Sequence, residues 1–252
     1  MGRMTLPKGV SDRVWNAALA YAAQGAAAID PTDEDLVSRR QLLYHRVDLT
    51  AATEHKFFDN TTDAPYITNL TKGRMPQGRV AVLQGFAFDV FIGRDTAGVA
   101  GVSEVLGTQE AAAADTADAT EIATAYQAIA TKVDVLRHAK LTLQFGTKVL
   151  FQDEWGLTRF PFPGGLDVAG PGYSLSGAYP ANNNTKVGTL TVNNGLASAG
   201  NMFALSPNPI IHENLQVIGR LNNQVALSIP AGYKLTAVMA FDAQIFGEPN
   251  NT

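Results

Sequence analysis

The stretch from Val80 to Ile92, VAVLQGFAFDVFI, constrains the fold of this chain more than any other. Its even positions carry large apolar side chains with the exception of Gln84, and its odd positions are mostly smaller. Successive side chains of a strand point to opposite faces of a sheet, so the pattern predicts one long β-strand with a bulky face toward a core. Strands usually have ~5–6 residues, and we expect this one to cross a whole sheet or to bend from one sheet into another.

Two later stretches, Leu141–Gln152 and Leu235–Phe246, repeat this alternation, so three long amphipathic strands far apart in sequence must meet in space. Asn193-Asn194-Gly195 and Asn222-Asn223 are typical of hairpin turns, because Asn and Gly adopt positive φ at little cost. Shorter strands are predicted at residues 42–49, 187–192, 202–205, 215–221 and 225–229. The predicted fold class is mainly β, an antiparallel eight-stranded jelly-roll sandwich, since eight strands in two sheets is the jelly-roll count.

We expect one β domain at residues 41–247, preceded by an N-terminal arm and helix in residues 1–40 and followed by a polar tail at 248–252. Ser11 is the predicted N-cap of the N-terminal helix, which ends near Gly25 or in the alanine run after it. Asp33, Glu34 and Asp35 are interpreted as the start of a short second helix rather than as a metal site.

The β domain is expected to carry two additions. An Ala-rich insertion at about residues 108–138 contains apolar residues at helical spacing and predicts a helix at Thr120–Arg137. A long loop rich in Gly, Ser, Asn and Pro is predicted at about residues 156–186. The irregular stretch at residues 53–78 contains aromatic residues, which indicate that it is held in place and has short strands of its own.

Composition narrows the range of functions. Charged residues make up 17% of the chain, against a typical ~25%. Because charged residues are depleted at the cores of interfaces, this indicates either a surface covered by other protein or a merely Ala-rich one. The net charge of −4 argues against a nucleic-acid binder that works through bulk electrostatics. The absence of cysteine excludes disulfides, thiolate metal sites and a cysteine nucleophile.

No targeting or membrane-spanning segment is predicted. Asp12, Arg13 and Asn16 interrupt any apolar core that a signal peptide would need. No stretch approaches the ~20 apolar residues that span a membrane as a helix. We therefore expect a protein that is synthesised in the cytoplasm.

Motifs for catalysis are missing, and we predict no catalytic, cofactor-binding or metal-binding residues. The four histidines are His45, His55, His138 and His212, and no two of them have the spacing of a helical metal pair. His45 and His55 with a distant third ligand could form a metal site, but structural histidines are the preferred interpretation. Asp153-Glu154, beside Trp155, could suggest a glycosidase carboxylate pair. Adjacent strand residues point to opposite faces, however, so a turn at the end of a strand is preferred.

Several residues near the chain start and around residue 150 could serve binding instead. Arg3, Lys8, Arg13, Lys148 and Arg159 could face an anionic partner, although scattered charges of this kind are more often only solvated. Trp15 with Tyr21 could insert into a neighbouring subunit or pack the helix on its own sheet, and the sequence leaves both open.

With these features, the chain resembles the jelly-roll major capsid proteins of tailless icosahedral bacteriophages over most of residues 40–247. The likeness is one of layout, and it lies in Phe57–Asn60, Thr68-Asn69-Leu70, Pro76, Gly78, Val80–Ile92, Gly146-Thr147-Lys148, Phe160–Gly165 and the last strand closing at Gly247. The resemblance implies a shell subunit, commonly trimeric, whose strands stand upright to the capsid surface, sometimes over an internal membrane. One jelly roll fits the length, and two compressed rolls would need further short strands in residues 53–78 and 160–210.

The predicted function is therefore that of a major capsid subunit, without cofactor or enzymatic activity, which self-assembles into an icosahedral shell. Its expected partners are itself as a homotrimer, other virion proteins such as vertex proteins, and an internal membrane or the genome through the N-terminal arm. Its expected location is the virion, after synthesis in the host cytoplasm.

Three alternatives remain. The first is a glycan-binding or spike-like β sandwich that uses Trp155, Tyr173 and Tyr179 as stacking platforms. The second is a cupin-like metalloenzyme that uses His45, His55 or His212. The third is a capsid protein of the other common phage fold, with a long helix and an extended loop spread over the shell.

Overall fold

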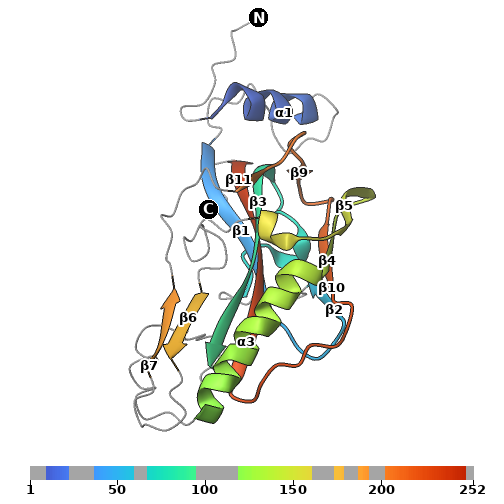
Figure 1. Ribbon diagram of the computed structural model, residues 1–252. Coiled ribbons are helices and arrows are strands. Elements are labelled where there is room, and N and C mark those ends of the chain that lie inside the picture. The colour runs from blue at the N-terminus through green and yellow to red at the C-terminus, as the bar shows by residue number, and fades with distance from the viewer. Residues whose placement is uncertain are drawn as a thin grey trace, which may run out of the picture.

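The structure is a computed structural model of the whole chain, in which most of the structured residues belong to β-strands (Figure 1). The residues that it describes are 10–22, 37–59, 67–94, 119–160, 173–178, 187–192 and 202–247. Within them lie two α-helices, two short 3-10 helices and eleven strands. None of the helices in these ranges is both long and apolar enough to cross a membrane.

The strands form two main antiparallel sheets and one separate hairpin. The first sheet has the order β1 (Val37–Asp48), β11 (Tyr233–Gly247), β3 (Arg79–Arg94) and β8 (Phe203–Ala204), and β9 (Ile210–Ile211) also pairs with β3. The second sheet has the order β2 (Glu54–Phe57), β10 (Val217–Asn222), β4 (Lys140–Phe145) and β5 (Lys148–Glu154). The hairpin consists of β6 (Tyr173–Ala178) and β7 (Val187–Val192).

A core rich in phenylalanine lies between the two main sheets. Phe86 of β3 is at its centre, with its ring centroid 5.0 Å from that of Phe160, 5.4 Å from that of Phe241 and 5.5 Å from that of Phe151. These four side chains come from both sheets and from the segment after β5, and their burial joins elements that are distant in sequence. Rings at these separations add specific aromatic contacts to the gain from apolar burial.

The long strand predicted at residues 80–92 is present as β3, but the prediction of a single bulky face was wrong. Gly85 pairs with Asp242 of β11 while Leu83 pairs with Ala243, so Gln84 is an extra residue in β3. Such a β-bulge shifts the alternation of side chains by one position. Phe86, Phe88, Val90 and Ile92 therefore face the core between the sheets, whereas Val80 and Val82 face the other side.

On that other side, α1 (Asp12–Ala22) packs against the first sheet near the start of β3. Trp15 is buried, and its ring centroid lies 5.9 Å from that of Phe246. The Oγ atom of Ser11 accepts a hydrogen bond from the backbone N–H of Val14 at 3.4 Å, which confirms Ser11 as the predicted N-cap. Of the two roles left open for Trp15, the structure has the helix packed on its own sheet.

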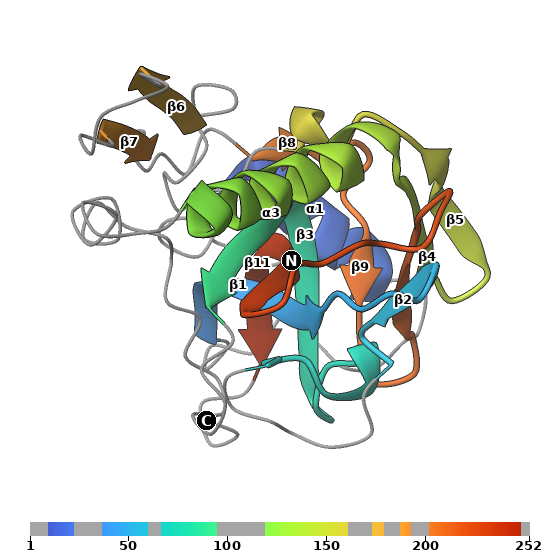
Figure 2. The same cartoon turned by 60° about the horizontal axis from the view of Figure 1, so that its bottom comes forward.

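The predicted Ala-rich helix is confirmed as α3 (Ala119–His138), which lies alongside β3 (Figure 2). Lys132 on α3 and Asp89 on β3 form a buried ion pair, with 3.4 Å between Nζ and Oδ1. The Oγ1 atom of Thr131 donates a hydrogen bond to the backbone carbonyl of Ser228 at 3.1 Å. These contacts tie the helix both to the first sheet and to the segment that leads into β11.

Two predicted strands are wrong. Residues 141–152 form β4 and β5 instead of one strand, because the chain turns at Gly146-Thr147, where Gly146 adopts a φ of 56°. Residues 225–229 form no strand, since the carbonyl of Ser228 bonds to α3 instead of to a sheet neighbour.

The other predicted strands are present, most of them with shifted ends. The strand predicted at 42–49 begins earlier, at Val37, and those predicted at 202–205, 215–221 and 235–246 correspond to β8, β10 and β11. The strand predicted at 187–192 is β7, with the predicted ends. The irregular stretch at 53–78 does contain a short strand, β2. The long loop predicted at about 156–186 is wrong for residues 173–178, which form β6 because they pair with β7.

Several other predictions fall outside the described residues. These concern the arm at 1–9, the short helix at 33–35, the part of the insertion before residue 119, the turn after Phe160 and the tail at 248–252.

Candidate functional site

The four histidines do not converge. His45 lies on β1 in the first sheet and is 1% exposed, and its Nδ1 accepts a hydrogen bond from the backbone N–H of Phe58. Burial lowers the pKa of His45 to about 4. The ring is therefore neutral near pH 7 and serves as a hydrogen-bond acceptor within the core.

The remaining histidines occupy three further places. His55 lies on β2 in the second sheet and accepts a hydrogen bond from the backbone N–H of Thr50, and burial lowers its pKa. His212 follows β9, and burial lowers its pKa although Glu213 opposes the shift. His138 is exposed at the end of α3. Among the described residues, no group of three His, Asp or Glu side chains is placed to hold a metal ion.

Asp153 and Glu154 lie at the end of β5, as the interpretation of a strand-end turn requires. Glu154 forms an ion pair with Arg159 of η2 (Leu157–Arg159), with 2.5 Å between Oε2 and Nη2. The Arg159 guanidinium also lies over the ring of Phe160, 4.9 Å from its centroid. Trp155 is 71% exposed beside this pair, which makes it one of the most exposed large apolar side chains described.

The positively charged candidates separate in the structure. Arg13 on α1 donates a hydrogen bond from Nη2 to the carbonyl of Leu205 at 2.9 Å, so it fastens the helix to the segment after β8. Lys148 is exposed at the start of β5. Arg3 and Lys8 lie outside the described residues, as does the side chain of Tyr21.

A groove of about 680 Å³ runs between α1, the β4–β5 turn and residues 207–215. Its lining is mostly apolar and includes Ala17, Val149 and Ile210, with Lys148 and His212 among its polar members. Val149 is 49% exposed there. The groove thus brings together two candidates, Lys148 and His212, that lie more than sixty residues apart in sequence.

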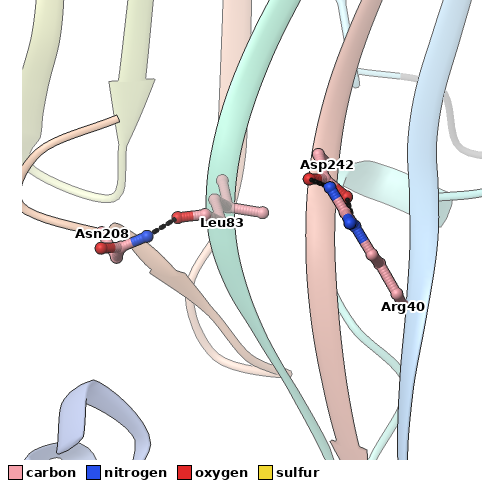
Figure 3. Close-up of polar contacts among 4 residues, drawn as sticks. All are labelled: Arg40, Leu83, Asn208 and Asp242. Carbon is pink, nitrogen blue, oxygen red and sulfur yellow. Dashed lines mark hydrogen bonds and ion pairs between the residues drawn. The ribbon is translucent and has the colours of Figure 1, made fainter. Parts of the chain in front are cut away.

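The β-bulge of β3 positions one wall of this groove. Asn208 donates a hydrogen bond from Nδ2 to the carbonyl of Leu83 at 2.6 Å (Figure 3). The backbone N–H of Leu83 in turn donates to the carbonyl of Pro209 at 2.9 Å. On the other side of β3, Asp242 of β11 binds Arg40 of β1 through two hydrogen bonds, of 2.8 and 2.5 Å (Figure 3).

Sequence reasoning missed this arrangement. The available signal was Gln84-Gly85, where the one polar residue among the even positions of the long strand is followed by a glycine. An interruption of this kind can mark a bulge.

A second cleft, of about 480 Å³, lies near the end of β3 that is farther from α1, where Tyr233 pairs with Arg94. Residues 49–51, which follow β1, and residues 227–234, which lead into β11, line it. It contains Tyr233 and Lys234, and the Nζ atom of Lys234 lies 2.6 Å from Oδ2 of Asp48.

Fold and geometry together define a mainly β protein with two antiparallel sheets, a helix on the outer face of one sheet and a helix inserted between two strands. No protein-family model matches the chain. No curated protein matches it. No solved structure matches it either.

Proposed function

We propose that this protein is a jelly-roll major capsid subunit that self-assembles into an icosahedral shell. The observation that carries the proposal is the pairing of strands. When β8 and β9 are counted as one interrupted strand along β3, the two main sheets have eight strands. The first pairs with the last (β1–β11), the second with the seventh (β2–β10), the third with the sixth (β3 with β8 and β9) and the fourth with the fifth (β4–β5).

This nested pairing is what results when a long antiparallel ribbon of strands rolls up into two facing sheets, which is the jelly-roll architecture of many capsid proteins. In this assignment, α3 is an insertion between the third and fourth strands, and the β6–β7 hairpin is an insertion between the fifth and sixth. The same architecture also occurs in lectins and cupins, so the choice of function depends on the surface.

Features of the surface support self-association. Charged residues make up only 17% of the chain. An apolar groove lies beside α1. Val149 in this groove is 49% exposed, and Val225 in the segment after β10 is 72% exposed. A rigid sandwich with such contact surfaces can close a symmetric assembly through repeated weak interfaces.

In this proposal the protein acts as a rigid building block whose surfaces bind other subunits, without an active site or a cofactor. It forms homotrimers within the capsid and contacts other virion proteins such as vertex proteins, and the N-terminal arm reaches an internal membrane or the genome. The protein is made in the host cytoplasm and resides in the virion.

The experiment that tests the proposal measures mass and shape of the purified full chain by light scattering and negative-stain electron microscopy across salt and pH. We expect trimers, rosettes or shells. Val149→Glu, which places a charge in the apolar groove, should reduce assembly, whereas Gln152→Glu on the same strand should not. A compact monomer at high concentration in every condition would contradict the proposal.

One observation favours a second candidate, a glycan-binding β sandwich. Trp155 is 71% exposed next to the polar pair of Glu154 and Arg159, and an exposed aromatic ring beside hydrogen-bonding groups can stack on a sugar. Of the other proposed platforms, Tyr173 begins β6 and Tyr179 lies outside the described residues. Glycan-array binding that Trp155→Ala abolishes, in a chain that stays monomeric, would favour this candidate over the capsid subunit.

A further inference from the structure

Two buried side chains at the end of the second sheet have polar atoms without hydrogen-bond partners. His55 is 5% exposed and Asn223 is 8% exposed. The unpartnered atoms are His55 Nδ1 and both amide atoms of Asn223, Nδ2 and Oδ1. Buried polar groups in native proteins nearly always have a partner, which is often an ordered water molecule, so three such atoms in one place indicate a bound species.

The two side chains share one face of the sheet. His55 of β2 pairs with Leu221 of β10, and the backbone N–H of Asn223 donates to the carbonyl of Thr53 at 2.7 Å. The pairing of the two segments thus continues to Asn223, which follows Leu221 by two residues. Its side chain is therefore on the same face as those of Leu221 and His55. Diagonal neighbours of this kind have Cα atoms ~7–8 Å apart, so one small molecule can contact the polar ends of both side chains.

The hydrogen bonds of His55 define which groups the site presents. The backbone N–H of Thr50 donates to His55 Nε2 at 3.0 Å, so Nε2 carries the lone pair. In a neutral imidazole the proton then sits on Nδ1, which becomes a buried donor. The site thus offers a donor from His55, together with a donor and an acceptor from Asn223.

We propose that a buried water molecule binds between His55 and Asn223 and bridges the start of β2 to the end of β10. Water accepts hydrogen bonds from His55 Nδ1–H and can in turn donate to Asn223 Oδ1, so it serves as acceptor and donor at once. A metal cation cannot bind to Nδ1 of His55, because this atom carries a proton. An anion has no hydrogen to donate, so the side-chain carbonyl of Asn223 would still lack a donor. The site does not depend on self-assembly, so it can be tested in any folded form of the full chain.

The first test uses the sign of a stability change. If water bridges the two residues, Asn223→Leu removes the bridge and leaves His55 Nδ1–H buried without an acceptor, and we expect Tm to fall by about 3–6 °C. If the site is dry, the same variant replaces two unpartnered atoms by an apolar group of similar size, and Tm stays the same or rises. Asn222→Leu is the matched control, because its side chain is on the opposite face of β10, and it should change Tm much less.

The second test separates a bridging water from a direct bond between the two side chains. A high-resolution crystal structure of the full chain should contain water density within hydrogen-bond distance of His55 Nδ1 and the Asn223 amide. The ring nitrogen shifts of His55, measured by NMR, should correspond to the tautomer with the proton on Nδ1. A direct His55–Asn223 hydrogen bond, an empty site, or a proton on Nε2 would each overturn the proposal.

Discussion

The two halves of β3 are equally buried but belong to different layers of the protein. Before Gln84, Val80 and Val82 pack with Trp15 and the rest of α1 on the outer face of the first sheet. After Gln84, Phe86 and its even-numbered successors pack into the core between the two sheets. The β3 side chains of both groups are nearly inaccessible to solvent.

Because of one inserted residue, a single strand contributes side chains to two hydrophobic clusters. A strand without a bulge keeps every second side chain on the same face. With the bulge, the bulky residues change sides at Gln84, where the edge of β3 is held by Asn208, Pro209 and Leu205 instead of by a regular strand. This division of β3 can be tested by four changes to the protein or its conditions.

Deleting Gln84 should have the largest effect. The deletion would remove the shift in register, so Val80 and Val82 would point into the core and Ala81 and Leu83 toward α1. Most of the stability of a typical domain, about 5–15 kcal/mol, depends on such a core, and we expect the cooperative unfolding transition to be lost. Circular dichroism recorded during heating shows whether the unfolding transition is still cooperative. Gln84→Ala keeps the residue count and should fold, and a folded deletion variant with native near-UV signals would contradict the division.

Phe86→Ala should destabilise the whole protein. Its ring is fully buried among Phe151, Phe160 and Phe241, and truncation of a core phenylalanine typically costs about 3–5 kcal/mol. Denaturant unfolding gives the free energy directly. Phe203 belongs to the same aromatic group but is exposed, so Phe203→Ala should reduce the free energy of unfolding by less than half as much. An equal loss for both variants would mean that Phe86 is not the centre of the core.

Acid should destabilise the half of the sandwich that contains His45. This residue pairs with Met239, which pairs with Phe88 of the second half of β3. Its pKa is about 4 in the folded protein and about 6.5 when unfolded, so below pH 6.5 the unfolded chain binds a proton that the folded one does not. Stability should therefore be complete above pH 6.5 and fall by about 3 kcal/mol as the pH decreases to about 4.

Unfolding free energies measured between pH 7 and pH 4 check this prediction. In His45→Asn the amide oxygen can still accept from Phe58, and the variant should lose most of the pH dependence. The remainder belongs to His55 and His212, because burial also lowers the pKa of each. The exposed His138→Asn is the control and should keep the full dependence. An unchanged slope in His45→Asn would assign the acid sensitivity to other groups.

Trp15→Ala should have the smallest and most local effect. The side chain belongs to the cluster on the outer face, and its loss removes contacts of α1 without opening the core between the sheets. We expect a global loss of about 1–2 kcal/mol. Hydrogen exchange should become faster in residues 12–22 while β3 and β11 keep their protection. Faster exchange throughout the first sheet would show that the two clusters unfold together.

Much of the fold followed from local patterns. The helix cap at Ser11, the Ala-rich helix and the strands β3 and β11 were predicted because each depends on spacing within one segment. The division of residues 141–152 was missed, since an alternating pattern continues through a tight turn at Gly146-Thr147 without a break. The strand β6 was missed because its pairing with β7, rather than its composition, makes it a strand.

For candidate sites, the sequence identified residue types but not their neighbourhoods. It favoured structural histidines and a strand-end position for Asp153-Glu154, and the structure has His45 and His55 in the two sheets as buried acceptors. It contained no signal that Lys148 and His212 would share a groove, or that His55 and Asn223 would share a buried face. The first pair meets only through tertiary packing and the second only through strand pairing, in each case across more than sixty residues.

Local side-chain periodicity was enough to predict the mainly β character, the long amphipathic strands and the two helices, because each depends on residues close together in the chain. Tertiary structure alone decided which strands pair, on which side of Gln84 each bulky residue is buried, and whether Trp15 faces its own sheet. Those choices depend on long-range burial and on hydrogen bonds of the backbone, whose partners the local pattern does not name.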